Sequence, residues 1–181
     1  MIITINGMPG SGKSTVADYL ARKFHLKHYS AGGIRREMAL KKGLTIAQLN
    51  KVGEKEAWTD KEVDEFQIKL GRERDNFIID GRLSWHFIPD SIKIYFIVDL
   101  KEGARRILLS KREEESYKNP GDALKKLKER IESDKKRYKK YYNLNPYTIG
   151  NYDIVIDTTN LSVEQMRKIT EKAIKNLIGK K

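Results

Sequence analysis

The sequence predicts an α/β fold in which a doubly wound parallel sheet is covered by helices on both faces. Short, continuous apolar runs alternate along the chain with longer segments of helical periodicity. Continuous runs are typical of strands that are buried on both faces, and such strands belong to parallel sheets. The length of 181 residues suits one domain, and neither an internal repeat nor a low-complexity linker divides the chain.

The expected elements follow one another in a regular order. Strands are expected over 1–5, 77–79, 92–98 and 154–156, with a short strand or loop over 28–30. Helices are expected over 14–24, 34–42, 60–72, 104–112, 123–142 and 162–178, with a further helix starting at Thr45. Two helix starts carry the capping-box spacing, Thr45 with Gln48 and Ser162 with Gln165. The stretch 31–33 is expected to be a turn, and 113–122 a loop around Asn119-Pro120-Gly121.

Composition limits the class of protein. Hydrophobic residues make up 39% of the chain, which is enough for a sizeable core and argues against disorder. The formal net charge of +12 favours acidic partners, either nucleic acid or phosphorylated small molecules. The chain has no cysteine, which excludes disulfides and thiolate metal sites. Its longest apolar run, 92–100, is too short to cross a bilayer and no secretory signal opens the chain, so we expect a cytoplasmic protein without a membrane partner.

A complete phosphate-binding motif, G-x-x-x-x-G-K-[ST], follows the first strand and precedes a helix. Its glycines let backbone N–H groups converge on phosphate oxygens, and the helix N-terminus adds partial positive charge. Lys13 can reach the β- and γ-phosphates and the Ser14 hydroxyl can ligate Mg²⁺, so ATP and Mg²⁺ are the expected cofactors. The expected nucleotide-binding residues of the motif are Gly7, Met8, Pro9, Gly10, Ser11, Gly12, Lys13, Ser14 and Thr15. A glycine-rich turn without a ligand is the alternative interpretation.

A second motif, Asp80-Gly81-Arg82, follows the strand expected over 77–79. A carboxylate at the carboxyl end of a central strand lies beside the phosphate loop in a doubly wound sheet, so Asp80 could hold Mg²⁺ through water. Arg82 could then bind an acceptor phosphate through two parallel hydrogen bonds from its guanidinium group. The alternative is a turn with an exposed ion pair. No N-K-x-D guanine-reading motif is present, which argues against a GTPase.

Arginines on two neighbouring helices suggest a lid that closes over the transferring phosphoryl group. Arg130, Asp134 and Arg137 are spaced i, i+4, i+7 and therefore share one helix face, while Arg106 and Arg112 lie on the preceding helix. A solvated basic helix is the alternative, and we favour it for the many lysines between 125 and 140.

The turn from Ser30 to Arg36 feeds the start of a helix. Its arginines oppose the helix dipole, which suggests an anionic ligand there. Surface solubility is the other explanation for these arginines. The three histidines, His25, His28 and His86, lack ligand spacing and are assigned structural roles.

These residues resemble the cytidylate kinases, especially their compact archaeal form, nearly from end to end. The phosphate loop is generic among kinases, and the spacing of Arg130, Asp134 and Arg137 is the more specific match. Lys13 departs from the compact archaeal members, which often carry threonine there. The other matching segments are Ser30-Ala31-Gly32 with Arg36 and Glu37, Asp60–Glu65 with Gln67, Asp80–Leu83, Ala104 with Arg106, Glu129 with Lys136 and Tyr138, and Tyr152–Thr158 with Leu161 and Ser162.

The resemblance implies roles for individual residues. Arg36, Arg82 and Arg137 would hold the acceptor nucleotide, chiefly its phosphate, beside Ser30. Arg130 and Asp134 would contact its sugar, and Arg106 would lie near the donor adenine or phosphates. The catalytic set is then Lys13, Arg82, Arg130 and Arg137, and the metal-binding set is Ser14 and Asp80.

The resemblance also implies the domain plan of a P-loop NTPase of the nucleoside-monophosphate kinase type. A single domain, 1–181, would contain a core of 1–29, 73–110 and 143–181, an acceptor-binding segment over 30–72 and a lid over 111–142. The expected reaction transfers the γ-phosphoryl group of ATP to CMP or dCMP, giving CDP or dCDP. An AMP kinase of the same fold and an ATP-dependent RNA or ribosome-assembly factor remain open alternatives. We expect a monomer and no nucleic-acid partner.

Overall fold

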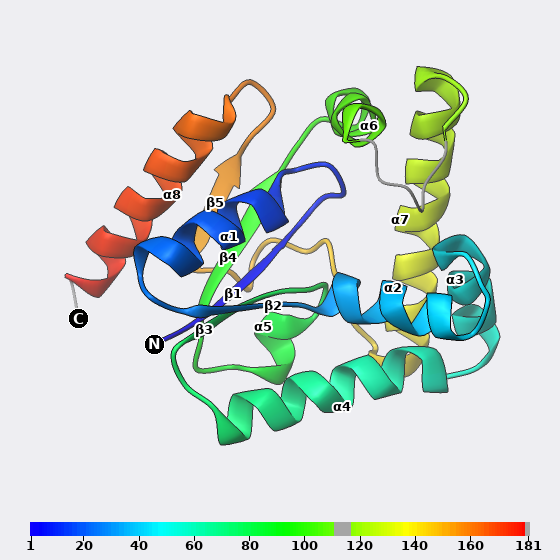
Figure 1. Ribbon diagram of the computed structural model, residues 1–181, viewed down its shortest axis with the longest axis horizontal. Helices are drawn as coiled ribbons and strands as arrows, with labels where there is room; N and C mark the ends of the chain where they lie inside the picture. Colours follow the sequence, from blue (N-terminus) through cyan, green and yellow to red (C-terminus); the bar gives the residue numbers. More distant parts are fainter. Residues whose placement is uncertain (111–116, 180–181) are drawn as a thin grey trace.

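The computed structural model describes residues 1–110 and 117–179, and within them the strands form one parallel sheet (Figure 1). Every neighbouring pair of strands runs parallel, in the order β2-β3-β1-β4-β5. The strands are β1 Ile2–Gly7, β2 Lys27–Ser30, β3 Phe77–Asp80, β4 Ile92–Ile97 and β5 Ile154–Asp157. The predicted doubly wound parallel sheet is therefore confirmed.

Helices cover both faces of the sheet. They are α1 Lys13–Lys23, α2 Ala31–Lys41, α3 Ile46–Lys55, α4 Trp58–Glu73, α5 Ser84–Phe87, α6 Leu100–Leu109, α7 Pro120–Tyr142 and α8 Val163–Ile178. Alternate strand residues such as Ile3 and Ile5 pack beneath α1 and α8, in one apolar cluster with Leu20 and Ile174. Residues of the opposite face, Phe77 and Ile79 among them, pack with Leu70 of α4 and Ile88.

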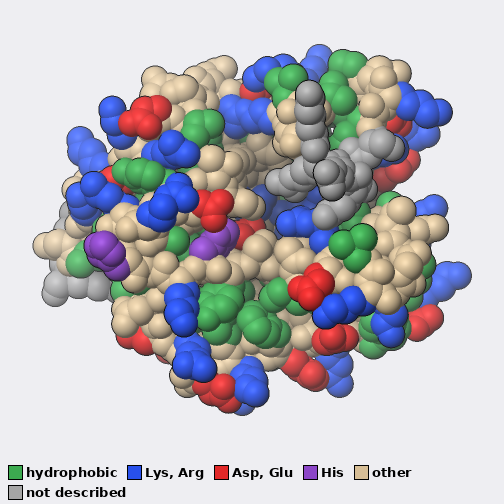
Figure 2. Space-filling view, in the orientation of Figure 1, with side chains coloured by type: hydrophobic (Ala, Val, Ile, Leu, Met, Phe, Trp, Pro, Cys, Tyr) green, Lys and Arg blue, Asp and Glu red, His purple; other side chains and the backbone are tan. Residues whose placement is uncertain are grey.

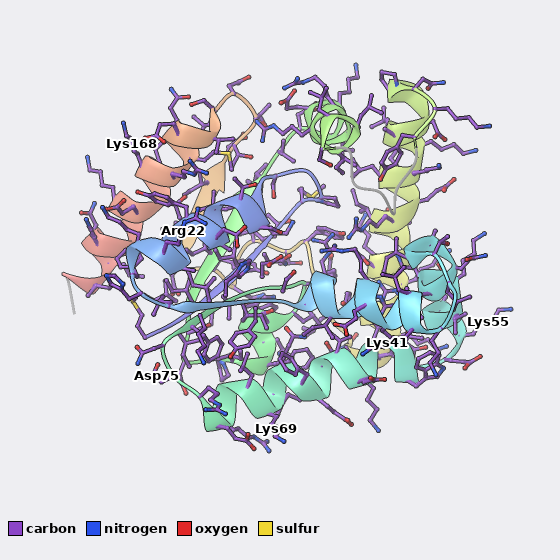
Figure 3. The ribbon with its side chains drawn as sticks, in the orientation of Figure 1. Arg22, Lys41, Lys55, Lys69, Asp75 and Lys168 are labelled. Atoms are coloured by element: carbon purple, nitrogen blue, oxygen red, sulfur yellow. The ribbon has the colours of Figure 1, made fainter. Side chains whose placement is uncertain are left out.

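Helices α2, α3 and α4 form a separate layer beside the carboxyl edge of the sheet, with α7 standing against α3 (Figure 1). A small apolar cluster around Leu49 and Val63 holds these three helices together. Figure 3 labels Lys41, Lys55 and Lys69 on these helices, and all three side chains are exposed. A second cluster, around Ala104 and Leu127, joins α6 to α7.

Both predicted capping boxes are present, at Thr45 and at Ser162, and they start α3 and α8. The expected turn over 31–33 is wrong, because Ser30 caps a helix there and its hydroxyl accepts a hydrogen bond from the Gly33 N–H at 3.1 Å. These residues are the first turn of α2.

Two further boundaries differ from the predicted ones. Asn119 is the N-cap of α7 and Pro120 is its first residue. The last residues of the loop expected over 113–122 therefore belong to the start of this helix. Asp99 caps α6, which therefore begins before the expected residue 104. Short helix α5 was not expected. Arg112 and the rest of 111–116, the first part of the predicted lid segment, lie outside the described residues.

Candidate active site

The phosphate loop joins the end of β1 to the start of α1 at the carboxyl edge of the sheet. Gly10 has a φ of +79°, and a Cβ there would lie 2.3 Å from the Gly103 carbonyl oxygen, so only glycine fits. Helix α1 begins at Lys13 without a side-chain cap, because Gly12 precedes it. Its first amides can therefore bind an anionic ligand, which the helix dipole also favours.

Lys13 folds back over this loop. Its Nζ atom lies 3.1 Å from the carbonyl oxygens of both Gly7 and Met8. The ammonium charge is thus fixed beside the space that phosphates bound to the loop would fill.

A hydroxyl and a carboxylate, which are oxygen donors of the kind that Mg²⁺ takes, meet beside the loop. Ser14 Oγ donates to Asp80 Oδ2 at 3.3 Å, and Asp80 is buried. Burial would raise the pKa of Asp80, but His28 and Lys13 outweigh it and hold this pKa below its usual value. Asp80 therefore stays ionised, and the oxygen donors suit a hard cation that keeps several waters. The described residues contain no cluster of three or more His, Asp or Glu side chains that could bind a metal without a substrate.

His28 was assigned a structural role from the sequence, but the structure places it against Asp80. Its Nε2 lies 2.9 Å from Asp80 Oδ1, and its Nδ1 lies 2.6 Å from Asp18 Oδ1. Burial would lower the pKa of His28, whereas the two carboxylates raise it above its usual value. From β2, the imidazole links Asp18 of α1 to Asp80 of β3, and it contacts the Asp80 oxygen that Ser14 does not.

Three arginines and two aspartates form an ion network in the wall of the cleft. Arg82 Nε donates to Asp134 Oδ2 at 2.8 Å, and Arg137 donates to both Asp134 and Asp60. Arg35 completes the network through Asp60 Oδ1 at 2.9 Å. Burial would raise the pKa of Asp134, but Arg82 and Arg137 outweigh it and hold this pKa far below its usual range.

Two further contacts hold the Arg82 guanidinium between the phosphate loop and Tyr147. Its NH1 group donates to the Gly7 carbonyl at 2.8 Å, and its guanidinium lies over the ring of Tyr147, 5.4 Å from the centroid. Tyr147 in turn donates from its hydroxyl to Asp134 at 2.7 Å. The guanidinium therefore links the phosphate loop to α7 in a single orientation.

One cleft connects the phosphate loop with the helices of the α2–α4 layer. Its walls include Ser14 and four cationic side chains, Lys13, Arg36, Arg82 and Arg130. Helices α3 and α4 contribute polar side chains, Asn50, Asp60, Asp64 and Gln67, together with apolar Ile46 and Val63. Figure 2 shows Lys and Arg side chains gathered around the hollow in the middle of this face.

A second hollow lies between the phosphate loop, α6 and the loop that joins β5 to α8. It is lined by Gly12, Thr15 and Asn160 among others, and Arg106 forms part of its wall. The Arg106 guanidinium donates to Glu102 at 2.7 Å and to the Thr158 carbonyl at 2.7 Å. Arg106 thus holds the β5–α8 loop beside the phosphate loop.

The structure brings most of the predicted site residues to one cleft. Its walls contain Pro9, Gly10, Gly12, Lys13, Ser14, Thr15, Ser30, Arg36, Asp80, Arg82, Arg130, Asp134 and Arg137. Arg106 lies in the neighbouring hollow. The carbonyl oxygens of Gly7 and Met8 accept hydrogen bonds from Lys13, and that of Ser11 accepts one from Thr158. Their roles toward ligands stay predictions.

Sequence reasoning missed several cleft residues. Arg35 is the buried arginine of α2, whereas Arg36 alone was singled out. Asp60, Asp64 and Gln67 were noticed only as part of a resemblance. Their i, i+4, i+7 spacing on one helix was the signal that could have placed them together on a buried polar face.

Comparisons with known proteins agree with this geometry. The model of the family described as "Cytidylate kinase-like family" matches residues 2–160. A cytidylate kinase of Methanocaldococcus jannaschii is 40% identical, over 98% of this chain and 99% of the relative. One of Sulfurisphaera tokodaii is 33% identical, over 99% of this chain and 98% of the relative.

Solved structures agree on the fold. A shikimate kinase from Bacteroides thetaiotaomicron superposes with a TM-score of 0.62 at 13% identity, covering 97% of this chain and 98% of the other. At that identity the likeness concerns the fold alone. In the part of the chain that the structure describes, no helix combines the length and hydrophobicity needed to span a membrane.

Proposed function

The chain belongs to the cytidylate kinase-like family, and on that premise we propose that it transfers the γ-phosphoryl group of ATP to CMP and dCMP. The observation that carries this proposal is a single cleft in which a complete phosphate loop faces buried arginines and a polar pocket. Donor phosphates need the loop, whereas the buried arginines at its edge suit the phosphate of an acceptor nucleotide.

The donor side is built for ATP with Mg²⁺. Lys13 and the amides at the start of α1 would hold its phosphates, and the Thr15 side of the second hollow, closed by Arg106, would take the adenosine. Ser14 and Asp80 would hold Mg²⁺, which when bound neutralises charge on the β- and γ-phosphates. His28 keeps the Asp80 carboxylate turned toward that position.

The acceptor side needs no general base, because the attacking group is already a phosphate oxyanion. Arg82 and Arg137 are fixed by Asp134 and so present their charge without reorganising during transfer. Arg36 and Ser30 line the same cleft at the start of α2 and would bind the acceptor phosphate. Arg130, on the cleft side of α7, would reach the transferring group.

The test is an acceptor panel of CMP, dCMP, UMP, AMP and GMP with ATP and Mg²⁺, followed by product chromatography. We expect CMP and dCMP to be phosphorylated with the highest kcat/KM. A preference for AMP would overturn the assignment in favour of an AMP kinase. RNA binding at micromolar affinity with a steep salt dependence, without phosphorylation of any nucleotide, would favour an RNA factor. A cytoplasmic location and a monomeric state remain proposals alongside this function.

A further inference from the structure

Helices α3 and α4 line the cleft with buried polar side chains whose role the phosphoryl transfer does not explain. Asn50 of α3 and Asp64 and Gln67 of α4 are exposed by only 7%, 4% and 2%. Apolar Ile46 and Val63 line the cleft beside them. A few fixed polar groups among apolar side chains on the wall of a cleft are typical of a site that orients a ligand with matching polar groups.

The Asp64 carboxylate is held in one orientation and still has room for a donor. Tyr142 donates from its hydroxyl to Oδ2 at 2.7 Å, and Gln67 donates from Nε2 to Oδ1 at 3.0 Å. Ser84 fixes Gln67 by donating to its Oε1 at 2.6 Å. A carboxylate offers about four lone-pair positions, so two contacts leave it able to accept further hydrogen bonds.

Asn50 supplies the opposite chemistry. Its Oδ1 accepts from Arg35 Nε at 3.1 Å, and Arg35 is held by the Thr59 carbonyl at 2.6 Å and by Asp60. Because its oxygen is engaged by Arg35, the amide presents Nδ2, which is a donor, to the remaining surroundings. Asn50 and Asp64 thus put a donor and an acceptor on the walls of one cleft.

This pattern matches cytosine and opposes uracil. Cytosine has an amino donor at N4 beside acceptors at N3 and O2, whereas uracil has an acceptor at O4 and a donor at N3. We propose that Asp64 is the residue that selects cytosine over uracil, by accepting from the N4 amino group while Asn50 donates to the acceptor side of the ring. Tyr142, Gln67 and Ser84 are positioning residues for the carboxylate. The inference rests on the proposed use of CMP.

The charge of Asp64 makes this selection dependent on pH. Burial raises the pKa of Asp64 to about 7, although the hydrogen bond from Tyr142 acts to lower it. The other charged groups that face it are Asp60 on its own helix, Arg35 on α2 and Arg137 on α7. Above this pKa the carboxylate only accepts and repels uracil O4, whereas below it the protonated form can donate to O4.

The test uses the full chain and compares Asp64→Asn with wild type at pH 8. Equilibrium binding and kcat/KM with saturating ATP are measured for CMP and for UMP. An amide can donate to O4 or accept from N4, so the CMP/UMP ratio should fall by about 5- to 150-fold, since a good polar pair is worth about 1–3 kcal/mol of base discrimination. UMP use should also rise in absolute terms, a gain that damage to the fold would not produce. Glu65→Gln, an exposed carboxylate on the same helix, is the matched control and should leave the ratio unchanged.

Wild-type protein provides a second measurement that needs no variant. The two substrates carry the same phosphate, so its titration cancels in the CMP/UMP ratio, which should rise between pH 6 and pH 8.5. If Asp64→Asn folds, a CMP/UMP ratio within about twofold of the wild-type ratio would overturn the role of Asp64. If it does not fold, a wild-type CMP/UMP ratio that does not change with pH would do so. Absence of turnover with any pyrimidine would instead overturn the proposed function, and binding of CMP against UMP would still decide whether Asp64 reads the base.

Discussion

Asp134→Asn tests whether the ion network in the wall of the cleft stabilises the fold. Asp134 is 3% exposed and accepts hydrogen bonds from Arg82, Arg137 and Tyr147. The substitution preserves size and removes the charge that compensates two buried guanidinium groups. Breaking a buried pair by neutralising one partner costs about 3–5 kcal/mol. For a domain of this length that corresponds to a fall in Tm of about 6–20 °C.

The assay is urea unfolding at pH 7, with Glu132→Gln as the matched control. Glu132 is on the same helix and pairs with Lys135 at 2.8 Å, but both side chains are exposed. Such a pair contributes only about 0.5 kcal/mol, so the two carboxylate-to-amide changes separate a buried pair from an exposed one. A loss below about 1 kcal/mol for Asp134→Asn would refute the reasoning.

The pH dependence of this difference follows from the depressed pKa of Asp134. The stabilisation is present above the ordinary aspartate pKa of about 3.9 and is lost as the pH falls through the lower folded-state pKa. The gap in unfolding free energy between wild type and Asp134→Asn should therefore be constant from about pH 5 to pH 8 and shrink below about pH 4. A gap that grows on acidification would contradict the assignment.

Three other predictions concern the proposed reaction. Lys13→Ala should fold normally, but its turnover rate should fall by a factor of about 10² or more, because the loop loses its fixed charge. A turnover rate within a few-fold of wild type would contradict a role for Lys13 in phosphoryl transfer. Arg82→Lys should weaken CMP use while leaving ATP binding nearly intact, as titration of each nucleotide would show; equal loss of both would move Arg82 to the donor side. Two nucleosides joined by five phosphates should increase protection from hydrogen exchange over 30–72 and in α7 more than in the sheet, and unchanged exchange would reject closure.

The structure refines where such closure can occur. The C-terminal end of α7 is tied to the α2–α4 layer, because Tyr141 donates to the Gly53 carbonyl at 2.7 Å and Tyr142 donates to Asp64. Lys140 adds hydrogen bonds to the carbonyls of Glu54 and Lys55 at the end of α3. New protection in α7 should therefore be greater near its N-terminus than near these anchored residues.

Much of the fold was predictable because the signals are local. The phosphate loop requires glycines at fixed positions, buried parallel strands require continuous apolar runs, and the capping boxes at Thr45 and Ser162 require only residues three apart. Where a boundary was wrong, a local signal had been given too little weight. Ser30 and Asn119 cap helices that begin in glycine- or proline-containing segments.

Local patterns were enough to predict the parallel α/β fold, the phosphate loop and the position of Asp80-Gly81-Arg82 at a strand end, because each depends on residues that are neighbours along the chain. Other features arise only when distant segments pack together: Arg35 is buried and Arg36 is not, His28 contacts Asp80, and Tyr142 donates to Asp64 from 78 residues away. Those outcomes depend on which helix faces which strand. Burial then fixes the charge states, which no pattern along one segment contains.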